Sequence, residues 1–226
     1  MFGFQRRNIA SFAVGHMALA YILGKASAKP LKVNINIPLI LVLSIIPDID
    51  LIFMGELHRG PTHSIIAALL VFIPIFVIYR KKAIPYFIAL VSHSLIADFF
   101  IGGRIQLLWP LTSQQFGLHE LNGPYLSIWS PINITLEWTL FAIATIIMVR
   151  NDDWSLFFQN KKSNLLLAIP ITTVLLPSFL SIPLGVPILL LPPHLFYLVV
   201  FSMSVLIVLN GFFKNRKMAK PLVNSV

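Results

Sequence analysis

The side chains that could do chemistry in this sequence are histidines and aspartates that recur within or beside strongly apolar segments. An ionisable group in such a segment is costly to bury in a membrane, and by default it marks a functional site. The members of this set are His16, Asp48, Asp50, His58, His63, His93 and Asp98. Imidazole and carboxylate ligands together suit zinc, manganese, iron or nickel, and the imidazoles argue against calcium or magnesium alone. The chain has no cysteine, so only nitrogen and oxygen atoms could hold such an ion.

Most of this set are predicted metal ligands, and two members are predicted catalytic groups. The ligands are His16, Asp48, His63, His93 and Asp98. A divalent transition metal, with zinc as first choice, would polarise the substrate oxygen and lower the pKa of its bound water to about 7. Asp50 or His58 could then accept the proton as a general base. The number of ions stays open, because Asp50, His58 and Asp98 could complete a second metal site or support the first.

The spacing of His93 and Asp98 sets a condition on the helix that carries them. They are five residues apart, which separates them by about 140° around an ideal α-helix. Both can reach one ion only if the helix widens, as in a π-bulge, or ends near Asp98. Otherwise Asp98 would hydrogen-bond to a metal ligand and orient it, without binding the ion itself.

Other polar residues have two interpretations each. Arg59 and Arg104 flank the predicted site and could hold a phosphate or carboxylate through forked hydrogen bonds, or they could anchor the chain to lipid headgroups. Glu137 is expected to pair with a neighbouring helix. His194 is expected to be a hydrogen-bonded residue near the membrane interface. In the turn before His63, Thr62 could cap the helix that follows.

The elements that must position these residues are predicted to be transmembrane helices. Of the 226 residues, 57% are hydrophobic and only 11% are charged, against about 25% charged in soluble domains. Apolar segments near the roughly 20 residues that cross a membrane lie at 9–25, 36–54, 62–80, 83–101, 129–149, 164–182 and 193–213. The predicted fold is an all-α, polytopic bundle of about seven segments, some kinked or re-entrant. It forms one domain over residues 1–226, with the site motifs within 15–111 and the helices of 129–213 as its packing part.

The distribution of basic residues predicts an orientation for this bundle. The formal charge is +9, but the lysines and arginines lie in short clusters between apolar segments, so membrane orientation explains them better than nucleic-acid binding. Placing Arg80, Lys81 and Lys82 in the cytoplasm puts 13 of the 17 basic residues inside, with Arg6 and Arg7 among the exceptions. All the histidines then belong to the non-cytoplasmic side of the cell membrane.

Five short motifs resemble, in order, those of the YdjM-like family of membrane-bound, predicted metal-dependent hydrolases. They are Gly15-His16, Ser44-Ile45-Ile46-Pro47-Asp48-Ile49-Asp50, His58-Arg59-Gly60-Pro61-Thr62-His63-Ser64, Ser92-His93-Ser94-Leu95-Ile96-Ala97-Asp98 and Leu107-Leu108-Trp109-Pro110-Leu111. The resemblance implies a helical inner- or cytoplasmic-membrane protein with metal-assisted hydrolase activity. The family usually places the second His and Asp four residues apart, whereas His93 and Asp98 are five apart.

The preferred functional hypothesis is metal-dependent hydrolysis at the membrane interface. The expected partners are membrane lipid and an anionic small molecule or lipid, with a lipid-type phosphoester as the first substrate and with no nucleic acid. Two other classes remain open. Broken helices carrying His and Asp also occur in metal or proton transporters, and a metal could simply tie the segments of a non-catalytic scaffold together.

Overall fold

The computed structural model describes residues 13–50, 59–117, 129–181 and 185–218, and the regular structure among them is helical. In chain order the helices are α1 (Ala13–Leu31), α2 (Ile37–Leu43), η1 (Ile46–Ile49), η3 (Pro61–His63), α4 (Ile65–Tyr79), η4 (Arg80–Lys82), α5 (Ile84–Ser92), η5 (His93–Gly102), α6 (Pro131–Arg150), η7 (Asp153–Phe158), η8 (Lys162–Leu167), α7 (Ala168–Pro170), η9 (Ile171–Leu175), α8 (Leu176–Phe179), η10 (Ile188–Leu190) and α9 (Leu191–Met218). The all-helical prediction is confirmed for these residues.

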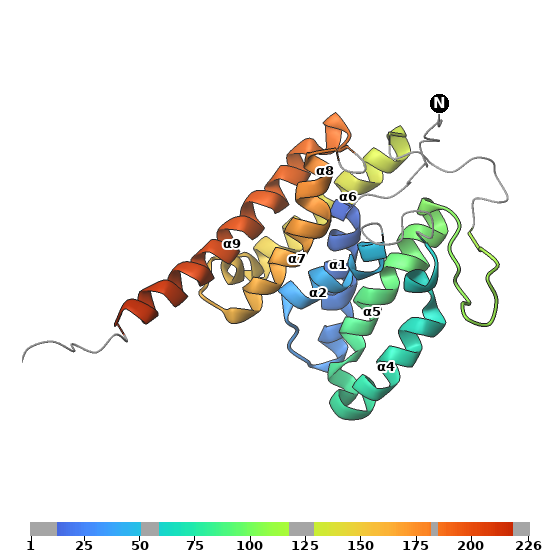
Figure 1. Ribbon diagram of the computed structural model, residues 1–226, viewed down its shortest axis with the longest axis horizontal. Coiled ribbons are helices and arrows are strands. Elements are labelled where there is room, and N and C mark those ends of the chain that lie inside the picture. The colour runs from blue at the N-terminus through green and yellow to red at the C-terminus, as the bar shows by residue number, and fades with distance from the viewer. Residues whose placement is uncertain (1–12, 51–58, 118–128, 182–184, 219–226) are drawn as a thin grey trace, which may run out of the picture.

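Helix α1 is the central element, and more than half of its residues are buried. In Figure 1 it lies between α5 on one side and α6 on the other. Glycines at two positions allow this close packing. A Cβ atom on Gly15 would lie 2.5 Å from an oxygen of Glu137 in α6, and one on Gly24 would lie 3.1 Å from Ile40 in α2.

Four helical stretches are long and apolar enough to cross a membrane. They are Ile84–Ile101, Pro131–Arg150, Lys162–Phe179 and Ile188–Lys214. The protein is therefore a membrane protein with several candidate spans, and the predicted count of about seven is not confirmed.

The apolar segment predicted over 36–54 does not form one long helix. Asn36 caps the start of α2, whose seven residues reach about 10 Å. The helix ends at Ser44, and the chain then turns through the short 3-10 helix η1, which contains Pro47. Residues 51–54 lie outside the described part of the chain. The break matters because it brings Asp48 beside His63 of η3 and His93 of η5, and Asp50 beside His63.

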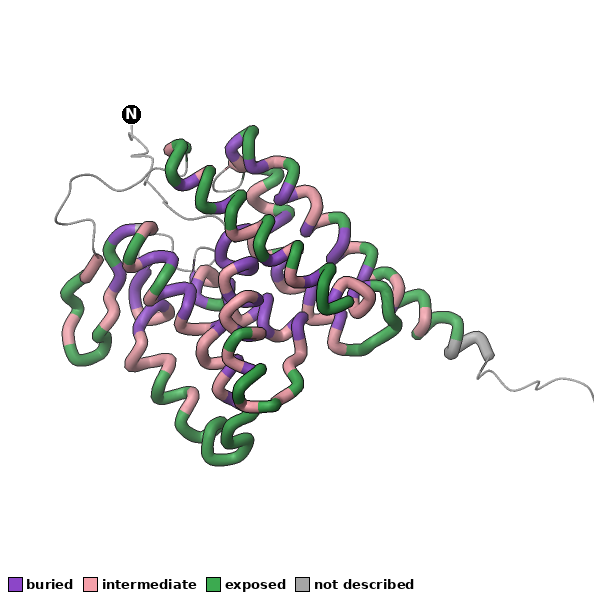
Figure 2. The backbone as a smooth tube through the Cα atoms, turned by 180° about the vertical axis from the view of Figure 1, so that it is seen from behind, coloured by how far each residue is buried: buried purple, intermediate pink, exposed green. Residues whose placement is uncertain are grey.

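The outer surface of the bundle is strongly apolar. None of the residues of α4 is buried, and Leu70, Val71 and Ile78 are among the most exposed of its large side chains. Figure 2 shows exposed residues along α4 and along the outer part of α9, around a buried centre. Such a surface fits contact with lipid chains.

Histidines and lysines lie at opposite ends of the same helices. His16 is in the first turn of α1, whereas Lys25 and Lys29 are in its second half. Lys82 likewise precedes α5 and His93 follows it. This separation matches the two-sided distribution predicted from the sequence. At the lysine end, Lys25 pairs with Asp153 at 2.6 Å.

Candidate metal centre

Four side chains from three separate elements converge on one point. The Nε2 atoms of His63 and His93 lie 3.2 Å apart. The Oδ2 atom of Asp98 lies 3.2 Å from Nε2 of His63 and 3.3 Å from Nε2 of His93. The Oδ1 atom of Asp48 lies 3.3 Å from Nε2 of His93 and 3.6 Å from Nε2 of His63. Apart from Asp48, these residues are almost completely buried.

These distances are in the range expected between atoms that bind one metal ion. Zinc binds imidazole nitrogen and carboxylate oxygen at about 2.0–2.2 Å, and two ligands in a tetrahedral arrangement with such bonds lie about 3.3–3.6 Å apart. The five separations that involve Nε2 of His63 or His93 run from 3.2 to 3.6 Å. In addition, Oδ2 of Asp98 is buried and accepts no hydrogen bond. A buried carboxylate oxygen needs a partner, and a cation shared with the two imidazoles would provide one.

His93 is held so that its Nε2 atom faces this point. Its Nδ1 atom lies 2.6 Å from the backbone carbonyl of Ser44, at the C-terminal end of α2. A carbonyl can only accept, so Nδ1 carries the proton and Nε2 presents its lone pair. The contact also gives a partner to a carbonyl that the end of a helix leaves without an intrahelical one. Ligating histidines in metalloproteins are commonly fixed in this way.

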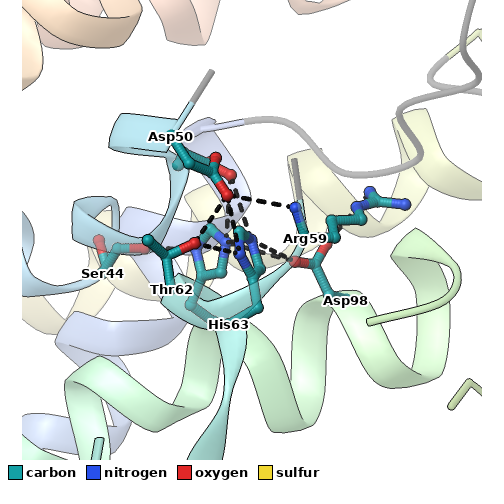
Figure 3. Close-up of polar contacts among 8 residues, drawn as sticks. Ser44, Asp50, Arg59, Thr62, His63 and Asp98 are labelled. Atoms are coloured by element: carbon teal, nitrogen blue, oxygen red, sulfur yellow. Dashed lines mark hydrogen bonds and ion pairs between the residues drawn. The ribbon is translucent and has the colours of Figure 1, made fainter. Parts of the chain in front are cut away.

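His63 is oriented by a relay of two side chains (Figure 3). Its Nδ1 atom lies 3.0 Å from Oγ1 of Thr62, and that hydroxyl donates to Oδ2 of Asp50 over 2.7 Å. The imidazole is therefore the donor toward Thr62, which again leaves Nε2 for the converging point. Burial lowers the pKa of the His63 imidazole, but Asp48, Asp50 and Asp98 around it raise that pKa well above its ordinary value. The surrounding carboxylates thus favour a positive charge here, from a proton or from a metal ion.

The capping role predicted for Thr62 belongs to Ser64. Ser64, rather than Thr62, caps α4 by accepting from the N–H groups of Ile66 and Ala67. The hydroxyl of Ser64 donates to the carbonyl of Trp109, so the loop that carries the fifth motif is fastened directly behind His63. Thr62 is left to contact the histidine itself.

Asp98 reaches the converging point because the helix around it is wide. The chain forms a π-helix from His93 to Gly102, whose hydrogen bonds join residues five apart. This is the widening that the five-residue spacing of His93 and Asp98 requires. Arg59 fixes the carboxylate by placing Nη2 3.3 Å from Oδ1, while Oδ2 faces the histidines.

Arg59 also ties this region to the turn before His63. Its backbone adopts a positive φ of 69°, an uncommon conformation for a residue other than glycine. Its N–H donates to Oδ2 of Asp50 over 3.2 Å, and its carbonyl accepts from the N–H of Gln106. The residue is only 8% exposed. The geometry gives Arg59 a structural contact with Asp98, and its predicted contact with substrate stays a prediction.

His16 lies against the centre in a different way. Its ring stacks on that of His93, with centroids 4.0 Å apart and planes 16° from parallel. Its buried Nδ1 atom has no hydrogen-bond partner. Beside the group of Asp48, His63 and His93, a second group of His16, His93 and Asp98 has possible ligand atoms within 4.8 Å of one another. The predicted ligand role of His16 stays a prediction.

The other predicted site residues lie at varying distances from the centre. Arg104 is exposed and follows η5 directly. His58 lies outside the described residues. His194 is buried, and its Nε2 atom is 2.7 Å from the carbonyl of Leu175, as expected for a hydrogen-bonded histidine. Glu137 accepts a hydrogen bond of 2.6 Å from the N–H of Gly15, so the predicted pairing with another helix is confirmed.

Sequence reasoning missed two supports of the centre, the Ser44 carbonyl and the Thr62 hydroxyl, and it did not identify Gly15 as the partner of Glu137. Every residue has a backbone carbonyl, so the residue type cannot show which carbonyl accepts a hydrogen bond from a histidine. Thr62 offered only its position next to a histidine, and Glu137 only its charge within an apolar segment.

Comparison with known proteins agrees with the motifs and the fold. The family described as YdjM inner membrane protein matches residues 12–182, well over half of the chain. No curated protein matches the chain, and no solved structure does. Since the match covers α1, η3 and η5 and most of the helices that follow, the chain belongs to the YdjM inner membrane protein family.

Proposed function

We propose that this protein is a membrane-bound, metal-dependent hydrolase whose ion is held by Asp48, His63, His93 and Asp98. The observation that supports this best is that Asp48 and Asp98 each place a carboxylate oxygen 3.2–3.6 Å from the facing Nε2 atoms of His63 and His93. Two imidazoles and two carboxylates suit zinc well. When bound, the ion would supply a Lewis acid and an activated water.

Asp48 is the ligand whose movement would open a coordination position for water or substrate. Its side chain is 14% exposed, whereas those of His63, His93 and Asp98 are at most 2% exposed. It also makes the longest of the contacts, 3.6 Å to His63. A catalytic zinc site keeps three protein ligands and one open position, or expands to five ligands. A rearrangement of Asp48 would give that open position, whereas a closed four-ligand site would suit only a scaffold.

The position of Asp50 favours an orienting role over that of a base. Its Oδ2 atom accepts from Thr62 and from the N–H of Arg59, on the Nδ1 side of His63. That side faces away from the converging Nε2 atoms. Asp50 would therefore act through the imidazole, as the carboxylate of a carboxylate–histidine–metal triad does. His58 remains the proposed general base.

The proposed substrate is an anionic phosphoester at the membrane surface. Arg104 is exposed at the end of the π-helix that carries Asp98, where its guanidinium could bind a phosphate with two parallel hydrogen bonds. Arg59 is buried against Asp98, so we assign the substrate contact to Arg104 first.

Transport fits this geometry less well. Ala20, Ile40 and Ala89 are fully buried and pack together. They lie four residues, or about one helical turn, from His16, Ser44 and His93 respectively. Among the described residues, this apolar layer separates the centre from the lysines at the other end of the bundle. A transport route would need polar groups there.

We place the centre on the non-cytoplasmic side, because the positive-inside rule assigns the lysine-rich end to the cytoplasm. The chain has no cysteine, so single cysteines report cleanly. We expect an impermeant thiol reagent on intact cells to label Ser113→Cys and to spare Lys161→Cys until the membrane is opened. The reverse pattern would move the centre to the cytoplasmic side.

The activity itself can be tested on detergent-purified protein. We expect about one equivalent of zinc or more, and chelator-sensitive release of phosphate or diglyceride from one of a panel of phospholipids and isoprenoid phosphates. His93→Ala, prepared identically, controls for contaminating hydrolases. Metal-loaded protein that releases no more product than this variant would refute the hydrolase proposal.

A further inference from the structure

Two apolar cavities follow helix α4 away from the metal centre. The first has a volume of about 240 Å³ and lies among η1, η3, α4 and α5. The second has a volume of about 530 Å³ and lies among α2, α4 and α5. Ala68, Val71 and Leu90 line both, so the two cavities adjoin. We call them together the α4 groove.

The first cavity begins at the residues that flank the candidate ligands. Pro47 and Ile49, on either side of Asp48, line it. So do Thr62 and Ser64, which flank His63, and Ser94, which follows His93. Asp48, the most exposed candidate ligand, is thus bracketed by residues of the groove wall. A molecule lying in the groove would have one end beside the open side of the centre.

Away from its far end, the groove offers few polar groups to a ligand. The hydroxyl of Thr62 donates to Asp50, and that of Ser64 donates to the carbonyl of Trp109. The remaining wall is made mainly of aliphatic and aromatic side chains. A sugar or nucleotide would lose hydrogen bonds to water there without replacement, which is costly. A hydrocarbon chain would lose none.

The length of the groove also suits a lipid chain. The fifteen residues of α4 extend about 22 Å, more than the roughly 15 Å of hydrocarbon in one leaflet. No residue of α4 is buried, so the groove is open to the bilayer along its side. At its far end lie Lys82, Asn34 and Tyr86, so the apolar wall stops where the polar end of the bundle begins.

We propose that the α4 groove binds the hydrocarbon chain of a long-chain lipid phosphoester, with the phosphate of that lipid at the metal centre. The inference rests on the proposed phosphoesterase function for its reaction, but chain binding can be measured without any turnover. It narrows the substrate class from anionic molecules in general to lipids that enter sideways from the membrane. The metal centre then selects the phosphate, and the groove selects the chain.

Binding is tested with a hexadecylphosphonate that carries a diazirine near the end of its chain. Its carbon–phosphorus bond is not open to ester hydrolysis, so the result does not depend on activity. We expect light-induced crosslinks to concentrate on residues 68–79 and 83–90, and to fall when a chelator removes the metal. Crosslinks spread equally over α6 and α9, with no effect of chelator, would mean ordinary contact with bilayer lipid and would overturn the proposal.

A matched pair of substitutions tests the groove by function. Ala68→Phe fills the junction of the two cavities, whereas Ala142→Phe adds the same bulk at an exposed position of α6. Excluding two methylenes from an apolar site should raise the KM for a hexadecyl phosphoester about tenfold in Ala68→Phe. The kcat/KM for a butyl phosphoester and the metal content should stay near those of the unchanged protein. Equal losses for both substrates, or an equal effect of Ala142→Phe, would refute the groove.

Failure of the two proposals would look different. Protein that hydrolyses neither ester but shows metal-dependent crosslinking in the groove would disprove the phosphoesterase and keep the lipid site. Protein that hydrolyses both esters equally well, with scattered crosslinks, would keep the phosphoesterase and remove the lipid site.

Discussion

The described residues of 13–117 and of 129–218 are both apolar and helical, but their irregular helices hold different residues. The first region contains one candidate span, and its helices give way to 3-10 turns and to a π-helix at the positions of Asp48, His63 and His93. The second contains three candidate spans, and its own 3-10 turns and π-helix η9 hold none of the candidate ligands. Irregular backbone in a membrane protein is tolerated where it is buried in protein. Here it positions the candidate ligands.

The two regions also treat their buried polar groups differently. In the second region, His194 has a carbonyl partner and Glu137 holds the backbone of α1, so these groups serve packing. In the first, two Nε2 atoms and a carboxylate oxygen face one another at 3.2–3.3 Å. A metal ion among them, or a proton on an imidazole, would satisfy this group. The comparison therefore predicts that substitutions of the buried polar side chains of the first region affect metal, and that those of the second affect stability alone.

The largest expected effect is the loss of metal when a ligand is removed. We expect His63→Ala or His93→Ala to lower zinc affinity at least about 100-fold, because a residue that binds the ion directly should matter more than the residues that orient it, whose loss costs about 10–100-fold. Zinc per protein, measured by mass spectrometry after dialysis against a weak chelator, checks this.

His194→Ala is the control from the second region. It also removes a buried imidazole, and we expect it to keep its full metal content. Retention of metal by both His63→Ala and His93→Ala would erase the distinction between the regions.

A smaller effect is expected from the residues behind His63. Thr62→Val removes the hydroxyl between His63 and Asp50 while keeping the shape of the side chain. We expect zinc affinity to fall about tenfold, at the lower end of the range for outer partners. Competitive titration against a coloured chelator measures it.

Asp50→Asn distinguishes an orienting role from a catalytic one. An orienting Asp50 predicts that metal affinity and turnover fall together, and that excess zinc restores most of the turnover. Turnover that stays low with the site fully loaded would instead make Asp50 the base, as the sequence first suggested.

The sequence predicted which residues gather at the centre better than it predicted the course of the backbone. Histidine and aspartate within apolar segments are costly to bury without a function, so the residues at Asp48, His63, His93 and Asp98 could be selected from type alone. The five-residue spacing even implied the wide helix that begins at His93. Hydropathy could not show that α2 ends after seven residues, because the same apolar residues suit a full span and a buried short helix.

The supporting contacts could not be predicted because they join residues far apart in the chain. His93 meets the carbonyl of Ser44 across 49 positions, and Glu137 meets Gly15 across 122. Arg59 was expected at the substrate, since its charge is visible in the sequence and its contact with Asp98 is not. Which of these contacts form depends on which helices pack together, and a single sequence does not state that.

Gly15→Ala tests a contact that links the two regions beside the centre. The new Cβ would lie 2.5 Å from an oxygen of Glu137, so the carboxylate must move and the N–H of Gly15 loses its partner. We expect a loss of about 1–3 kcal/mol in unfolding free energy, the cost of a buried group left unsatisfied. Thermal unfolding in detergent measures it.

A matched change at Gly24 separates this effect from crowding alone. Gly24→Ala meets only the flexible side chain of Ile40, at 3.1 Å, and should cost less than Gly15→Ala. Equal losses would mean that the hydrogen bond to Glu137 contributes little to joining the regions.

The smallest effect is expected at Arg104, and it tests where the centre meets its substrate. Arg104→Lys keeps the charge but loses the forked geometry that binds phosphate with two hydrogen bonds. The loss of one such bond, about 1 kcal/mol, corresponds to a rise in KM of about fivefold, with kcat and zinc content unchanged. Arg59→Lys is the informative partner, because Arg59 contacts Asp98 and its change should weaken metal binding. If Arg104→Lys instead lost metal while Arg59→Lys raised only the KM, the two arginines would exchange roles, and the buried guanidinium would be the one that reaches the phosphate.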